Sequence, residues 1–194
     1  MSKNLNTIQK IAKAGRIISK IIFIFSIIGA VASFIGVSAL WGLHKVELDG
    51  VEVVNIIEEA GAPFVTTMFS ACISILYCIS SAVIFKFAEI YFSNELEVGT
   101  PFTYDGAKEL LRLGLIGLIL PLCVSAISSI AFTVTKLFWP ILEPDALIES
   151  PSIGIALIVI IISFILKYGA DLEEKAQSYS EQTQSTNTDN VNID

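Results

Sequence analysis

Four long apolar stretches without a charged side chain constrain this chain more than any other feature of its sequence. They cover residues 21–43, 64–85, 113–135 and 152–166. A helix over the first stretch would be about 34 Å long at about 1.5 Å per residue, enough to cross a hydrocarbon core of about 30 Å. The fourth stretch is shorter, but Lys167 can extend it by directing its ammonium group towards water. Because lipid offers no hydrogen bonds to the backbone, each stretch is expected to be helical.

These stretches predict the fold class and the domain organisation. We expect an all-α, polytopic membrane protein whose four transmembrane helices form an antiparallel bundle. The transmembrane domain would cover 17–175, between a basic N-terminal segment (1–16) and a disordered polar tail (176–194). Its helices are expected at about 17–43, 64–94, 103–138 and 152–170. A cleaved signal peptide ending near Ala30–Ala32 is the alternative for the first stretch, but signal peptides have apolar regions of only about 7–15 residues.

The composition excludes some classes of protein function and argues against others for this chain. Hydrophobic residues make up 54% of the 194 residues and charged residues 16%, whereas soluble chains carry roughly 45–50% and about 25%. A soluble enzyme is therefore excluded, and a net charge of −7 argues against direct nucleic-acid binding, which needs a basic face. One histidine and three cysteines predict neither a metal site nor a disulfide framework. No Asp, Glu, Lys, Arg or His lies within the four stretches, so we expect no enzymatic activity and no cofactor.

The positive charges predict the orientation of the chain. Ten of the twelve Lys and Arg side chains lie in the two terminal segments or between the second and third stretches. Only Lys45 and Lys136 lie in the other two connections. Because cytoplasmic loops carry the excess of Lys and Arg, both termini are expected in the cytoplasm of a multi-pass protein of the cell membrane.

The sequence predicts local structure in two of the segments that connect the apolar stretches. Asp49-Gly50 separates the alternating segments 46–48 and 51–53, which predicts a short β-hairpin in the outer, acidic loop. A short interfacial helix is expected at 54–60. On the inner side, Thr103 is the expected N-cap of the third helix, and Asp105 in the first turn would face the helix dipole.

Small and hydroxyl-bearing side chains recur at helical spacing inside the spans. The second helix carries a stripe on one face, formed by Ser70, Ser74, Tyr77 and Ser81. The first helix carries Ser26, Gly29, Ser33 and Gly36, and the third carries Gly114 and Gly117. Close helix–helix packing is the simpler interpretation, and a polar-lined cavity is the alternative.

Two inner segments resemble a known family. Gly99–Thr103, followed by Leu110-Leu111-Arg112-Leu113-Gly114, resembles the G-x-P-F … L-x-x-L/I-G pattern of YoaS-like bacterial membrane proteins. Gly169–Glu174 resembles the second signature of that family, although Lys175–Ser178 replaces its usual D-L-T-I/V end. The family is catalogued as a domain of unknown function. The resemblance implies a four-helix inner-membrane protein, often encoded beside a small helix-turn-helix regulator.

These segments define a candidate cytoplasmic docking motif. Its residues are Gly99, Pro101, Phe102, Arg112, Gly169, Leu172, Glu173 and Glu174. The simpler interpretation is that they cap and dock helix ends, with the Phe102 ring packed near 168–172. The functional interpretation is a docking face for a cytoplasmic partner such as a helix-turn-helix regulator, and a homo-oligomer is a further open alternative. The leading hypothesis is therefore a non-catalytic sensor or immunity-type protein that acts by contact, and the alternative is a small permease or channel subunit.

Overall fold

The computed structural model describes residues 3–43, 47–48, 51–52, 64–98, 103–140 and 153–191. Four long helices dominate it: α1 (Lys3–Leu43), α3 (Phe64–Val98), α4 (Tyr104–Phe138) and α5 (Ile153–Val191). Each contains a segment long and apolar enough to cross a membrane. The predicted all-α class with four antiparallel helices is confirmed.

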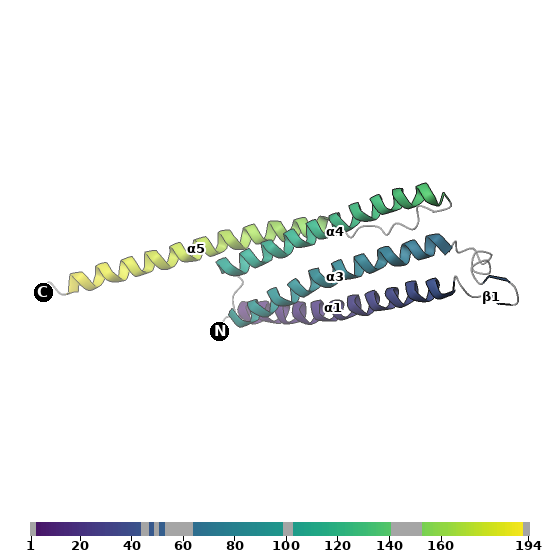
Figure 1. Ribbon diagram of the computed structural model, residues 1–194. Coiled ribbons are helices and arrows are strands. Elements are labelled where there is room, and N and C mark those ends of the chain that lie inside the picture. The colour runs from purple at the N-terminus through teal and green to yellow at the C-terminus, as the bar shows by residue number, and fades with distance from the viewer. Residues whose placement is uncertain are drawn as a thin grey trace.

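The helices lie side by side in the order α1, α3, α4, α5, so that each helix packs mainly against its neighbour in this row. Figure 1 shows that both chain termini lie at one end of the array, where α3 also ends and α4 begins. We call this the termini end. The strand β1 (Glu47–Leu48) lies at the opposite end, beyond α1 and α3 (Figure 1).

The pair α1 and α3 packs in one regular antiparallel register of small residues. The Ser26 and Ser81 hydroxyl oxygens lie 3.2 Å apart, and those of Ser33 and Ser74 lie 3.3 Å apart. In each pair the two residue numbers add to 107, as antiparallel neighbours in one register must.

Two glycines of α1 continue this register on both sides of the serine pairs. A β-carbon at Gly29 would lie 3.1 Å from the Cys78 Sγ, and one at Gly15 would lie 2.7 Å from the Phe92 ring. These pairs have the same sum of 107. Glycine therefore occurs where α3 comes too close for a side chain on α1, which is typical of close-packed membrane helices.

The contact between α4 and α5 is also built on small residues. A β-carbon at Gly114 would lie 2.7 Å from Ile160 Cγ1 and 3.2 Å from the Ile160 backbone nitrogen. Gly117 faces Ala156 with more room, at 3.9 Å. Between α3 and α4, the Phe69 and Phe132 rings meet edge to face with centroids 6.0 Å apart.

The distribution of apolar side chains fits a membrane protein. The buried residues are mostly small, among them Ala12, Ala82 and Ala107. Large apolar side chains such as Phe25 and Ile130 are about two-thirds exposed. A water-soluble monomer does not expose such a continuous apolar surface, whereas a lipid-facing surface requires it.

Three helix bounds differ from the sequence-based prediction. α1 begins at Lys3 instead of 17, α3 continues to Val98, and α5 continues to Val191 through the segment predicted as a disordered tail. The N-terminal extension has a packing reason, because Gly15 receives the Phe92 ring of α3. In α5 the membrane span supplies the helix nucleus. Residues that tolerate helix, such as the Glu, Lys, Ala and Gln at 173–177, then prolong the helix.

The predicted hairpin is confirmed. β1 (Glu47–Leu48) and β2 (Val51–Glu52) pair antiparallel, with Glu47 opposite Glu52 and Leu48 opposite Val51. This register leaves Asp49-Gly50 as the two-residue connection that the sequence indicated. The helix expected at 54–60 lies outside the described residues.

Candidate functional site

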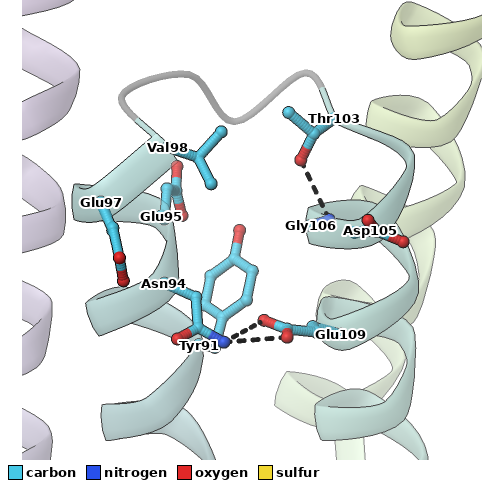
Figure 2. A pocket seen from close by; sticks show the side chains of 9 residues that line it. All are labelled: Tyr91, Asn94, Glu95, Glu97, Val98, Thr103, Asp105, Gly106 and Glu109. Carbon is cyan, nitrogen blue, oxygen red and sulfur yellow. Dashed lines mark hydrogen bonds between the residues drawn. The ribbon is translucent and has the colours of Figure 1, made fainter.

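A pocket of about 230 Å³ lies at the termini end, between the last two turns of α3 and the first two turns of α4. Figure 2 shows Asn94 and Glu109 pointing towards each other from the two helices, with the Tyr91 ring beside them. α3 contributes Tyr91, Asn94, Glu95, Glu97 and Val98, and α4 contributes Asp105, Gly106 and Glu109 beside the cap residue Thr103.

The α4 side of the pocket is fixed by a helix cap. Thr103 has extended backbone angles, and its hydroxyl accepts a hydrogen bond from the Gly106 N–H at 3.0 Å. Its carbonyl accepts the Ala107 N–H, also at 3.0 Å. An N-cap threonine satisfies a backbone donor that the first helical turn leaves open. The predicted cap at Thr103 is confirmed, and it fixes the direction in which α4 starts.

A polar clamp joins the two helices across the pocket. The Asn94 side-chain amide donates to both carboxylate oxygens of Glu109, at 2.9 and 3.1 Å (Figure 2). Hydrogen bonds to a charged acceptor are stronger than those between neutral groups. The clamp therefore sets the distance between the ends of α3 and α4.

Tyr91 forms the apolar wall of the pocket. Its side chain is buried, and its ring meets that of Phe92 edge to face at 5.3 Å. The Glu95 carboxylate, one turn further along α3, lines the same pocket. Because the Phe92 ring fits over Gly15 of α1, the position of this wall is set by the packing of α1 against α3.

The pocket is rich in hydrogen-bond acceptors. Glu95, Glu97, Asp105 and Glu109 line it, and none of its described lining residues is Lys or Arg. Such a site favours cationic groups and hydrogen-bond donors. Nevertheless, no group of three His, Cys, Asp or Glu residues is placed to hold a metal ion within the part of the chain that the structure describes. The geometry therefore fits a basic side chain better than a metal ion.

The structure places only part of the predicted docking motif. Gly99, Pro101 and Phe102 lie outside the described residues, so the predicted position of the Phe102 ring stays a prediction. Arg112 is exposed on α4, and its guanidinium carbon lies 5.3 Å from the centre of the Phe87 ring.

The remaining motif residues lie along α5. Gly169 is half-buried, Leu172 and Glu174 are exposed, and Glu173 lies between them in the helix. No hydrogen bond, ion pair or ring contact among the described residues joins this segment to Arg112. Arg112 and the described side chains of the α5 segment therefore form no common cluster.

The residues of the serine stripe on α3 have two different kinds of neighbours. Ser74 and Ser81 make the hydrogen bonds to α1 described above. Tyr77 instead lines a second, mainly apolar cavity of about 270 Å³ between α3, α4 and α5, which Ser81 also borders. Ser70 is half-buried. Close packing and a cavity thus both occur, on different sides of the same helix.

The acidic pocket was not predicted from the sequence. Its residues are ordinary polar side chains beyond the ends of the apolar stretches, and no short motif marks them. A usable signal was the brief connection 99–102 between two antiparallel helices, which must bring the last turns of one beside the first turns of the other.

The fold and this pocket define a small, multi-pass integral membrane protein with an acidic pocket at the termini end. Comparisons with protein-family models, curated proteins and solved structures find no match to this chain.

Proposed function

We propose that this protein is a non-catalytic sensor or immunity-type membrane protein that acts by binding a basic surface of a cytoplasmic protein at its termini end. The observation that carries the proposal is the length of α5. After Leu166, the last residue of its apolar stretch, α5 continues to Val191, a distance of about 37 Å at about 1.5 Å per residue. Figure 1 shows this part of α5 extending past the ends of the other helices. We call residues 169–191 the arm.

The charge of the arm supports a basic partner. It contains five acidic residues and one lysine, Lys175, so its net charge is −4. The acidic pocket at the same end of the molecule adds four carboxylates. Opposite charges steer association and suppress wrong partners, so both features favour the same class of partner surface.

The composition of the arm supports a role in contact. Leu172 and Tyr179 are its exposed large apolar side chains among the described residues. A helix that is polar on nearly all sides gains little stability by itself. A partner that packs on Leu172 and Tyr179 would stabilise it, in the way that many recognition helices are ordered by binding.

A helix-turn-helix regulator fits these requirements. Such a protein carries a basic face for DNA, which the acidic arm and pocket would complement. The motif resemblance of the inner segments to YoaS-like proteins points to the same class of partner. In this mechanism the membrane protein holds the regulator by the surface that the regulator uses for DNA, and release follows a change in the transmembrane helices.

The test is a binding measurement with the full chain in lipid nanodiscs. The soluble component is a purified small helix-turn-helix protein with a basic DNA-binding face. We expect binding that weakens steeply with salt, and a loss of at least about tenfold in affinity for Glu173→Lys/Glu174→Lys, because this variant changes the local charge by four units. The matched control is Glu47→Lys/Glu52→Lys, which makes the same charge change in the hairpin at the opposite end.

Two outcomes would contradict the proposal. One is equal binding by the arm variant and the hairpin control. The other is no binding together with solute flux through the purified protein in liposomes, which would support the permease or channel alternative.

A further inference from the structure

A second groove at the termini end lies between α4 and α5, and its surroundings differ from those of the acidic pocket. It has a volume of about 230 Å³. Tyr104 and Lys108 border it from the first turns of α4, together with Leu111 one turn further on. Phe164 and Lys167 border it from α5. Polar and apolar side chains thus meet in one cavity shared by two membrane helices.

The packing of the two helices explains why a groove opens here. α4 and α5 approach each other closely at Gly114, where the Ile160 side chain and backbone leave no room for a β-carbon. Towards the termini end, larger side chains replace glycine at the contact, and Leu111 and Phe164 line the resulting space. The groove therefore begins one turn beyond this close contact.

The groove carries positive charge without a partner carboxylate. Lys108 and Lys167 are both exposed, and neither forms an ion pair within the described ranges. Lys167 Nζ instead lies 5.5 Å from the centre of the Tyr104 ring. For comparison, Lys86 on α3 is paired with Glu89 at 2.9 Å.

The nearby acids lie elsewhere on the two helices. Glu109 borders the acidic pocket, on the side of α4 that faces α3. Asp105 also borders this pocket and precedes Lys108 by three residues, but within the described ranges it forms no ion pair with Lys108. Asp171 follows Lys167 by one helical turn and likewise forms no ion pair with it. α4 thus carries the Glu109 carboxylate towards α3 and the Lys108 side chain towards the groove shared with α5.

The groove lies at the depth where a helix leaves the hydrocarbon. Lys167 directly follows the charge-free stretch of α5, and Lys108 precedes the charge-free stretch of α4, which starts at Leu113, by little more than one turn. Phe164, which is 58% exposed, and Leu111 lie on the apolar side. Lysines between membrane helices at the headgroup level are typical of sites for anionic lipids.

From this arrangement we infer that the groove between α4 and α5 binds the headgroup of an anionic phospholipid. Lys108 and Lys167 neutralise the phosphate from two sides, and Tyr104 lies beside them at the interface. The first segment of an acyl chain lies against Leu111 and Phe164. The contact ties the first turns of α4 to α5 through a lipid, on the side of α4 that the Asn94–Glu109 clamp does not hold.

The test is lipid binding to the full-length protein in detergent, measured by native mass spectrometry. The probes are phosphatidylglycerol and phosphatidylcholine with identical acyl chains, and glycerol phosphate as a soluble headgroup. We expect tighter binding of phosphatidylglycerol than of phosphatidylcholine. Lys108→Gln/Lys167→Gln should weaken phosphatidylglycerol binding by about thirtyfold, because each lysine near an anionic lipid contributes roughly fivefold.

Two further variants make the test specific. Lys10→Gln/Lys13→Gln removes two exposed lysines of α1 from the same end of the molecule, and it should leave phosphatidylglycerol binding unchanged. Lys108→Arg/Lys167→Arg should retain binding, because the charges stay in place. If the double Gln variant is not monodisperse, each single Gln variant carries the test with an expected loss of about fivefold.

Three results would overturn the inference. The first is equal loss of phosphatidylglycerol in the α1 control and in the groove variant. The second is loss of binding in the double Arg variant, which would show that charge is not the basis of recognition. The third is displacement of the lipid by glycerol phosphate at equal concentration, which would show a site for free phosphate esters instead of a membrane lipid.

Discussion

A close contact with the backbone of the neighbouring helix makes Gly114 the most informative position for a stability test. In Gly114→Ala, the new β-carbon would lie 2.7 Å from Ile160 Cγ1, 3.3 Å from Val159 Cγ1 and 3.2 Å from the Ile160 backbone nitrogen. The Ile160 side chain can turn away, but the backbone nitrogen cannot move without separating α4 from α5. Overpacking of this kind costs typically about 1–3 kcal/mol.

The same helix supplies the matched control. In Gly117→Ala the β-carbon meets only the Ala156 β-carbon, at 3.9 Å, which is an ordinary contact. Both variants gain the same intrinsic helix propensity, about 1 kcal/mol for Gly to Ala. This gain cancels in the comparison, so the difference between the two variants isolates the steric cost.

We therefore expect Gly114→Ala to be less stable than Gly117→Ala by about 1–3 kcal/mol. The assay is reversible unfolding of the purified protein in mixed micelles, followed by far-ultraviolet circular dichroism. Equal stability of the two variants would refute the close approach of α4 and α5 at Gly114, and with it the geometry of the groove beside it.

Three further predictions concern the other contacts. Ser74→Leu should destabilise the α1–α3 pair by about 1–3 kcal/mol because a bulky side chain enters a close-packed register. Ile79→Leu, at a half-exposed position, should be nearly neutral. Similar unfolding curves for these two variants would argue against the register. Thr103→Ala should cost about 1 kcal/mol through loss of the N-cap, and Thr103→Ser should restore most of it in the same assay. A double-mutant cycle of Asn94→Ala and Glu109→Ala should give a coupling energy of about 1.5 kcal/mol, and additive effects would mean that the clamp does not form in solution.

Local signals in the sequence predicted the parts of the fold that depend on few residues. A charge-free stretch determines a membrane helix because the backbone has no other way to satisfy its hydrogen bonds. Thr103 and Asp49-Gly50 act within one turn of the chain, so the cap and the hairpin could be predicted without knowing the packing. The helical continuation of α5 after Lys175 could not be predicted in this way. A polar composition indicates that a segment is soluble, but it does not indicate whether a helix that starts in the membrane continues through it.

Contacts between helices were harder to predict. The small residues of the first and second spans were visible in the sequence, but the pairing of Ser26 with Ser81 requires the register of two helices. Gly15 was missed because it lies before the apolar stretch, and its contact with Phe92 follows only from the register of α1 and α3. The acidic pocket lies beside the short connection 99–102, whereas the groove around Lys108 joins α4 to α5, which the sequence separates. Neither has a motif of its own.

The central claim is that a four-pass protein presents its acidic arm and pocket to the cytoplasm. The most direct measurement is labelling of single cysteines in intact cells with a membrane-impermeant thiol reagent, after replacement of the three native cysteines by alanine. Leu48→Cys, in the hairpin, should be labelled from outside, whereas Glu97→Cys and Ser185→Cys should be labelled only after the membrane is permeabilised. Labelling of Ser185→Cys in intact cells would contradict the account. Together with protection of Leu48→Cys it would indicate the inverted orientation, and together with labelling of Leu48→Cys it would indicate an odd number of spans.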